Sequence, residues 1–96
     1  MGKVIWSPTA HKDIDLIAEY IARDSVERAA LFVTKLIEQT DKLKTYPMAG
    51  RKIPEMNETS KREIIYGSYR IMYQIMKNGE VWITGVVHGA RDWQPK

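Results

Sequence analysis

The most constraining feature of the chain is the stretch 62–91, REIIYGSYRIMYQIMKNGEVWITGVVHGAR, in which Asn78-Gly79 separates two runs rich in β-branched and aromatic residues. Asn-Gly is favoured in two-residue hairpin turns because both turn positions need a positive φ. The sequence therefore predicts a β-hairpin in which Ile75 faces Trp82 and Tyr69 faces His88.

This register divides the hairpin into two faces, because successive side chains of a strand point to opposite sides. One face would carry Tyr69, Ile71, Tyr73, Ile75, Trp82, Thr84, Val86 and His88, and the other Arg70, Met72, Gln74, Met76, Val81, Ile83, Gly85 and Val87. Both sets contain enough apolar side chains to require cover. We therefore expect the hairpin in the centre of a sheet rather than at its edge.

Length and composition predict a single domain, 1–96, with 96 residues of which 44% are hydrophobic. We find no apolar run long enough to span a membrane and no signal-peptide pattern, so we expect no membrane association. The chain has no cysteine, which excludes disulfides and thiolate metal sites and is typical of a cytoplasmic protein.

His11 and His88 are far apart in sequence, so neither a metal nor another cofactor is expected. The net charge of +3 is compatible with a nucleic acid or an acidic protein partner but does not require one.

The first half of the chain predicts a short strand followed by two helices. Residues 3–6 are β-prone, and Ser7-Pro8 is typical of a helix start, with Ser7 as N-cap. Apolar residues at helical spacing then predict a helix ending near Arg23, and a second helix over about 26–44 with Asp24 as its N-cap and Glu27 reaching back. The short gap between them favours an antiparallel helical hairpin.

The second half predicts the rest of the sheet. We interpret 48–60 as a loop, 62–65 as a strand and Gly67-Ser68 as the turn before the hairpin. The expected order is β-α-α-β-β-β. This is an α+β domain in which the helical hairpin packs on a mainly antiparallel four-stranded sheet.

In order and spacing, these segments resemble the RelE/ParE superfamily of toxins from type II toxin–antitoxin (plasmid stabilisation) systems. The resemblance covers nearly the whole chain and rests on VIWSPTA at 4–10, YPMAGR at 46–51, PE at 54–55, RE at 62–63, YRIMY at 69–73 and VVHGARD at 86–92. It implies a cytoplasmic toxin that forms a hetero-oligomer with a cognate antitoxin.

The branch resembled most is ParE, on P-x-x-G-R-x-x-P-E at 47–55 and the VHGARD ending. ParE-like toxins are taken to poison DNA gyrase without catalysis and to be neutralised by a ParD-like antitoxin. RelE-like toxins are instead ribosome-dependent mRNA endonucleases, with a row of cations on the strand before YR and a tyrosine near the C-terminus. Here Glu63 follows Lys61 and Arg62, and 92–96 has no tyrosine.

The chemistry of RNA cleavage gives an independent argument. Attack by a 2′-hydroxyl needs a base, an acid and cations for the phosphorane charge. The candidates are Lys61, Arg70, His88 and Arg91, with Arg51 and Arg62 as further cations. In the predicted register Arg70 and His88 lie on opposite faces and would not converge on one phosphate.

We therefore expect no catalytic residues under the ParE interpretation, and Arg51, Arg70, Arg91 and Trp93 as target-binding residues. For Arg70 the alternative is an ion pair with Glu55 or Glu63 that anchors the loop. The nuclease remains one alternative function, with ribosome and mRNA as partners. A further alternative is an inactive toxin-fold protein that only binds antitoxin.

Overall fold

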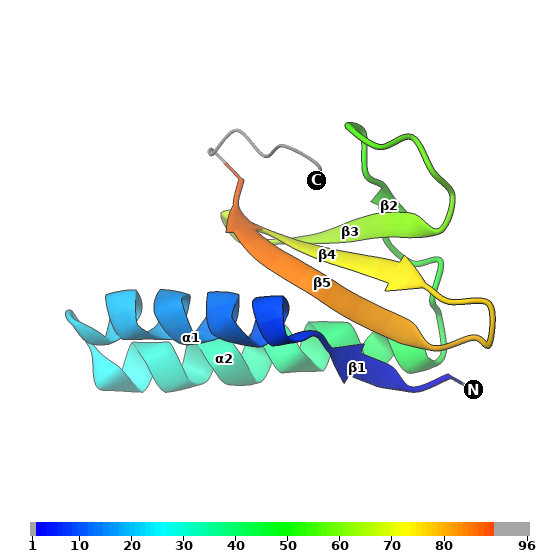
Figure 1. Ribbon diagram of the computed structural model, residues 1–96. Helices are drawn as coiled ribbons and strands as arrows, with labels where there is room; N and C mark the ends of the chain where they lie inside the picture. Colours follow the sequence, from blue (N-terminus) through cyan, green and yellow to red (C-terminus); the bar gives the residue numbers. More distant parts are fainter. Residues whose placement is uncertain (1, 90–96) are drawn as a thin grey trace.

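The structure is a computed structural model that describes residues 2–89 (Figure 1). Its elements are β1 (Val4–Trp6), α1 (Pro8–Ala22), α2 (Val26–Asp41), a 3₁₀ turn η1 (Lys42–Lys44), β2 (Arg51–Lys52), β3 (Lys61–Tyr66), β4 (Tyr69–Ile75) and β5 (Val81–His88). No helix within residues 2–89 is both long enough and apolar enough to cross a membrane.

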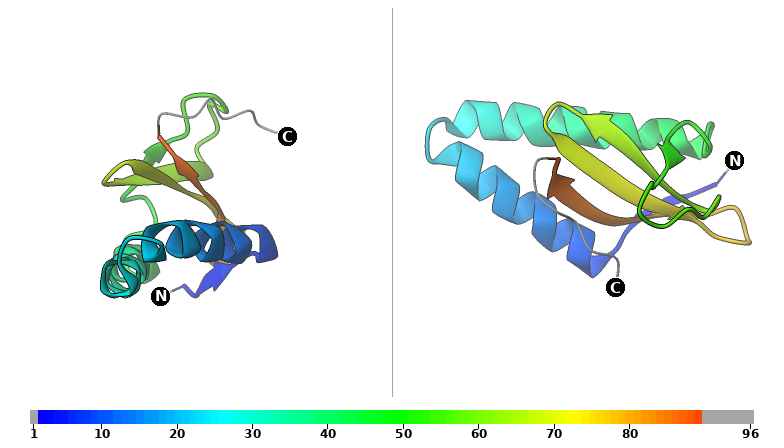
Figure 2. Two further views of the ribbon diagram at one scale, coloured as in Figure 1. Left: turned by 90° about the vertical axis from the view of Figure 1, so that its left-hand side faces the viewer. Right: turned by 90° about the horizontal axis from the view of Figure 1, so that it is seen from above.

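One mixed sheet with the strand order β1-β5-β4-β3-β2 forms one layer of the fold. β1 pairs with β5 in parallel, and all other neighbours are antiparallel. Figures 1 and 2 show α1 and α2 side by side on one face of this sheet. The predicted α+β class is confirmed. The sheet has a fifth strand because β2, inside the segment expected as a loop, pairs with β3 through Arg51 and Glu63.

The helix starts depend on two serine caps. Ser7 accepts a hydrogen bond from the Ala10 N–H at 3.0 Å, as predicted, with Pro8 in the first turn. At α2 the N-cap is Ser25, which accepts from the Arg28 N–H at 3.1 Å, so the expected Asp24 cap is wrong. Asp24 instead lies in the turn that follows α1, where its N–H donates to the Ile21 carbonyl.

The turn between β4 and β5 is longer than expected. The Met76 N–H donates to the Glu80 carbonyl and the Gly79 N–H to the Met76 carbonyl, which closes a loop of three residues. Of its residues only Gly79 has a positive φ, +88°. The side chain of Asn78 accepts the Glu80 N–H at 3.0 Å, and this local bond replaces the left-handed conformation expected of Asn78.

The hairpin register is confirmed at its far end and wrong near the turn. Tyr69 pairs with His88 and Arg70 with Val87, but a bulge lies where Thr84 has no partner on β4. Beyond the bulge Ile75 pairs with Val81 instead of Trp82. A one-residue shift exchanges the faces of a strand.

Because of this shift, Val81 and Ile83 join the core on the helix side, contrary to the prediction. They are fully buried with Ile71, Val86 and Tyr73, against side chains of both helices and η1, among them Ala10, Ile14, Leu36 and Leu43. Thr84 is exposed.

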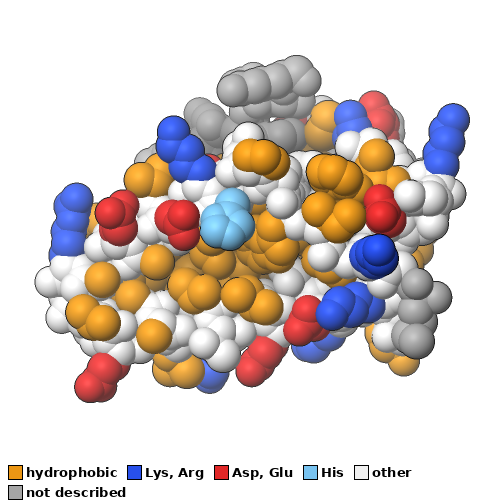
Figure 3. Space-filling view, turned by 60° about the horizontal axis from the view of Figure 1, so that its bottom comes forward, with side chains coloured by type: hydrophobic (Ala, Val, Ile, Leu, Met, Phe, Trp, Pro, Cys, Tyr) orange, Lys and Arg blue, Asp and Glu red, His pale blue; other side chains and the backbone are white. Residues whose placement is uncertain are grey.

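The helical hairpin also presents apolar side chains to solvent. Figure 3 shows hydrophobic side chains gathered over the helices, with charged side chains around them. The exposed large hydrophobic residues of α1 and α2 are Leu16, Tyr20, Val26, Leu31 and Ile37.

Candidate functional site

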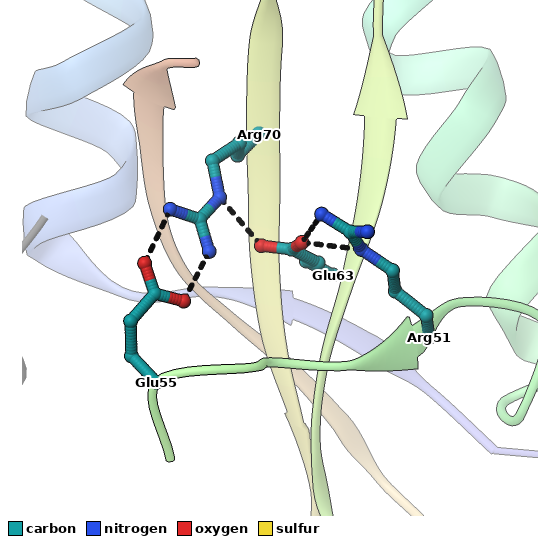
Figure 4. Close-up of polar contacts among 4 residues, drawn as sticks. All are labelled: Arg51, Glu55, Glu63 and Arg70. Atoms are coloured by element: carbon teal, nitrogen blue, oxygen red, sulfur yellow. Dashed lines mark hydrogen bonds and ion pairs between the residues drawn. The ribbon is translucent and has the colours of Figure 1, made fainter. Parts of the chain in front are cut away.

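Four charged side chains form one ion-pair network on the face of the sheet opposite the helices (Figure 4). Arg70 of β4 donates from Nε to Glu63 Oε1 at 2.6 Å and from Nη1 and Nη2 to the two oxygens of Glu55 at 2.9 and 2.7 Å. Glu63 of β3 accepts a further bond of 2.7 Å at Oε2 from Arg51 Nε. The carboxylate of Glu63 is fully buried, and the side chain of Arg70 is nearly so. Both carboxylate oxygens of Glu63 nevertheless accept a hydrogen bond, one from Arg70 and one from Arg51.

The network changes the proton affinity of its members. Hydrogen bonds from Arg70 lower the pKa of Glu55 from 4.5 to about 2, against a smaller opposing effect of burial. The same bonds raise the pKa of Arg70 above its ordinary value. Arg70 is therefore a fixed cation that cannot exchange protons with a substrate.

A second contact holds the segment before β2 on the sheet. The buried Tyr73 hydroxyl donates to the Pro47 carbonyl at 2.7 Å and accepts the Gly50 N–H at 2.9 Å. Gly50 has no room for a side chain, because a Cβ there would lie 2.5 Å from the Glu63 carbonyl oxygen. Together with Glu55, these bonds attach the segment 47–55 to β3 and β4 at several points.

The remaining predicted cations of the sheet also have local partners. Lys61 lies 3.6 Å from the carboxylate of Glu58. Arg62 donates to the carbonyls of Gly50 and Thr59 at 2.8 and 2.9 Å. Each of these side chains helps to hold the loop between β2 and β3.

His88 lies on the helix side of the sheet, away from Arg70. Its ring meets the ring of Tyr69 edge-on, with centroids 5.3 Å apart, and Tyr69 in turn contacts Phe32 of α2. Arg70 pairs with Val87, the neighbour of His88, so the two side chains leave opposite faces of the sheet, as the register predicted. Arg91 and Trp93 lie outside the described residues.

A groove of about 730 Å³ separates the second half of α1 from the end of β5. Its helix wall contains Leu16, Ile17 and Tyr20, and its sheet wall contains Tyr69 and Val86 to His88. We call this the α1–β5 groove. The sequence analysis missed Leu16 and Tyr20, although their spacing of four residues beside the main apolar stripe is a signal for a second apolar strip on the helix.

Asp13 is the other residue that the sequence analysis missed. Its Oδ2 accepts the Val86 N–H of β5 at 3.0 Å. No pattern in a single sequence reports a contact between residues so far apart. Among residues 2–89 no group of His, Cys, Asp and Glu is arranged to hold a metal ion.

The fold is shared with solved toxin–antitoxin structures. A chain of the "Chromosomal ParDE TA system from P. aeruginosa" superposes with a TM-score of 0.75 at 21% identity, covering 92% of this chain and 96% of that one. A chain of the toxin–antitoxin complex RelBE2 from Mycobacterium tuberculosis gives a TM-score of 0.57 at 23% identity, covering 91% of this chain and 96% of that one.

Sequence comparison identifies the family. The chain is 30% identical to "Putative toxin Y4kP" of Sinorhizobium fredii over 93 residues. The aligned residues cover 95% of this chain and 92% of that protein. The model of the family "ParE toxin of type II toxin-antitoxin system, parDE" matches residues 4–93. The chain therefore belongs to the ParE family of toxins from type II toxin–antitoxin systems.

Proposed function

We propose that this toxin acts in the cytoplasm by binding and poisoning DNA gyrase, without catalysis of its own, and that a ParD-like antitoxin neutralises it in a hetero-oligomer. The antitoxin part is supported by family membership and by the solved relatives, which are toxin–antitoxin systems. The gyrase part rests on the ParE branch and on the arrangement of the basic side chains.

The observation that carries the absence of catalysis is the separation of Arg70 and His88. Cleavage of RNA by its own 2′-hydroxyl needs a proton acceptor and a cation at the same phosphate. Arg70 is held by Glu55 and Glu63 on one face of the sheet, while His88 packs on Tyr69 at the other face. Arg51 and Lys61 are engaged with Glu63 and Glu58.

The same network supports a binding role for Arg51. Its side chain is 61% exposed although it pairs with the buried Glu63, so one edge of the guanidinium faces solvent in a fixed orientation. A cation held in this way loses little conformational entropy when it binds a target. We therefore assign target contacts to Arg51 first and to Arg91 and Trp93 beyond β5, and we assign Arg70 the role of orienting the loop that carries Arg51 and Glu55.

The decisive experiment is a supercoiling assay with the purified chain, DNA gyrase, ATP and relaxed plasmid. A gyrase poison abolishes supercoiling and accumulates linear DNA after treatment with detergent and protease. Arg51→Ala should reduce the poisoning, whereas Lys12→Ala, on the exposed side of α1, serves as the matched control.

Two other outcomes would contradict the proposal. Unimpaired supercoiling together with cleavage of ribosome-bound mRNA would assign the chain to the nuclease class. Unimpaired supercoiling, intact mRNA and harmless expression without antitoxin would leave a protein that only binds antitoxin.

A further inference from the structure

Three segments that are far apart in the sequence meet at one end of the molecule. They are the segment that leads into β1, the turn η1 and the loop between β4 and β5, and Figures 1 and 2 show all three at the end opposite the α1–α2 connection. The Gly2 N–H donates to the Lys44 carbonyl at 3.3 Å, and the Val81 N–H donates to the Lys3 carbonyl at 2.8 Å. Gly2 also lies directly against the β4–β5 loop, because a Cβ at this position would overlap the Gly79 carbonyl. Backbone contacts therefore fix the relative positions of the three segments.

Each of these segments carries at least one exposed lysine. The four residues are Lys3, Lys42, Lys44 and Lys77, and we call them the lysine cluster. Lys44 lies 3.5 Å from the carboxylate of Asp41, and both of these side chains are more than half exposed. Within residues 2–89 the other three lysines form no ion pair. Their charges are therefore available to a ligand from solvent.

Positive charge is balanced more closely on the rest of the described surface. The cations of the ion-pair network on the sheet are matched by glutamates. The opposite end of the molecule mixes bases and acids at Arg23, Asp24, Glu27 and Arg28. In the β4–β5 loop the acidic residue is Glu80, whose carboxylate accepts the indole N–H of Trp82 at 3.3 Å. An excess of positive charge is therefore concentrated at the lysine cluster.

The composition of this surface fits a phosphate backbone better than a protein. Protein interfaces have an apolar centre, but none of the exposed large hydrophobic residues lies in 2–3, 41–44 or 76–80. Single-stranded nucleic acids are bound largely by stacking on aromatic rings, and these segments contain no aromatic residue. Interfaces with duplex DNA are polar and strongly positive, and lysine contacts phosphate as a compact charge. The surface therefore has the chemistry of a duplex-binding site.

We propose that the lysine cluster binds the phosphate backbone of duplex DNA and that the toxin uses it to hold the DNA on which gyrase acts. This inference rests on the proposed poisoning of gyrase and adds a second contact to it, since Arg51 is assigned to the target itself. Phosphate contacts carry no sequence information, so the binding is independent of sequence and weakens as salt is added. Simultaneous contacts to protein and DNA bind the toxin to the gyrase–DNA complex more tightly than either contact alone.

The first test uses the full chain and a short fluorescent DNA duplex, without gyrase. Fluorescence anisotropy should show binding at low salt, and the logarithm of the affinity should fall with the logarithm of the salt concentration by about 0.9 for each phosphate contact. The cluster variant combines Lys3→Gln, Lys44→Gln and Lys77→Gln. It should raise the Kd about tenfold or more at low salt and reduce this salt dependence by about 2 to 3.

A matched control removes the same total charge from the helices. It combines Lys12→Gln, Arg28→Gln and Lys35→Gln, at exposed positions of α1 and α2 outside the lysine cluster. A general effect of net charge weakens both variants equally, whereas the proposed site predicts a Kd raised less than about threefold in the control. All substituted positions are exposed, so circular dichroism should show that both variants are folded.

Two further variants keep the test decisive if the cluster variant does not fold. Lys77→Gln alone, in the exposed β4–β5 loop, should reduce the salt dependence by about 1. Replacement of the same three lysines by arginine keeps the charge and should leave the affinity for the duplex within about threefold of the original. Unchanged salt dependence in Lys77→Gln would overturn the proposal.

The second test repeats the supercoiling assay with gyrase and the same proteins. The cluster variant should need about tenfold more toxin to accumulate the same amount of linear DNA, whereas the helix control should match the original chain. If the original chain does not poison gyrase, the proposed function fails. The titration without gyrase still decides whether the lysine cluster binds DNA, so the two failures are distinguishable.

Four results would overturn the proposal. The first is equal affinity of the cluster variant and the helix control for the duplex, or no binding of the original chain at low salt. The second is lost poisoning with unchanged affinity for DNA, which would assign the cluster to an acidic surface of the protein target. The third is tighter binding of a single strand or of duplex RNA than of duplex DNA. The fourth is full poisoning by the cluster variant after its affinity for DNA is lost.

Discussion

Arg70 and Glu55 face each other across two parallel hydrogen bonds, of 2.9 Å from Nη1 to Oε2 and 2.7 Å from Nη2 to Oε1. Among basic side chains, only arginine presents two parallel donors that match the two oxygens of a carboxylate in this way. It joins β4 to the loop between β2 and β3, while the third donor of Arg70 holds the buried Glu63. The guanidinium therefore positions two acidic residues from different segments.

Arg70→Met should destabilise the fold strongly. Removing the cation leaves Glu63 buried with Arg51 as its remaining partner, and breaking a buried ion pair costs about 3 kcal/mol or more. Urea unfolding should show this loss in the free energy of unfolding, whereas Arg28→Met, at an exposed position of α2, should change it by less than about 0.5 kcal/mol. Equal stability of the two variants would mean that the network adds nothing to the fold and that Arg70 is better explained as a target contact.

The pH dependence of stability should report on Glu55. Its pKa is about 2 in the folded chain, below the value of 4.5 expected when the chain is unfolded. As the pH falls, Glu55 therefore binds a proton in the unfolded chain before it does so in the folded chain. The stabilisation from the ionised Glu55 is complete above pH 4.5 and is lost as the pH falls toward 2. Thermal unfolding between pH 6 and pH 2 should show a weaker dependence in Glu55→Gln than in the original chain. Glu38→Gln, at an exposed position of α2, should leave the dependence of the melting temperature on pH unchanged. The same pH dependence in all three proteins would contradict the lowered pKa of Glu55.

Tyr73→Phe should lower stability by about 1–3 kcal/mol, because it leaves the Gly50 N–H without its buried acceptor and the Pro47 carbonyl without its donor. Tyr46→Phe is the matched control, since Tyr46 is 67% exposed in the same segment. Burial raises the pKa of the Tyr73 hydroxyl, so titration of tyrosine absorbance should lose its latest-titrating component in Tyr73→Phe. An unchanged melting temperature would contradict the anchoring role of this hydroxyl.

Local chemistry explains which parts of the fold could be predicted from the sequence. Ser7-Pro8 defines a helix start within two residues. At the far end of the hairpin, the pairing counted from the turn placed Tyr69 opposite His88 and Arg70 opposite Val87, as the structure has them. The bulge at Thr84 has no such signal, because it depends on how β5 meets β1 and β4 together. One extra residue there was enough to move Val81 and Ile83 to the other face.

The candidate site likewise contains contacts that could be predicted from the sequence and contacts that could not. Pairing of Arg70 with Glu55 or Glu63 could be named as an alternative because opposite charges lay on neighbouring predicted segments. The bond from Val86 to Asp13 could not, because it joins α1 to a strand far along the chain through one side chain. For that reason the α1–β5 groove, which Asp13 and Val86 both line, became visible only in the folded structure.

The α1–β5 groove yields the last prediction, which uses two leucines of almost equal exposure. Leu16, 54% exposed, lines the groove, whereas Leu31, 55% exposed, lies on α2 outside it. If the groove receives antitoxin side chains, Leu16→Asp should raise the Kd for the cognate antitoxin at least tenfold, because a carboxylate would be buried in an apolar pocket. Leu31→Asp should raise it less than threefold, and neither change should lower the melting temperature by more than a few degrees, since both positions are exposed. Equal losses of affinity would place the antitoxin across the outer surface of both helices rather than in the groove.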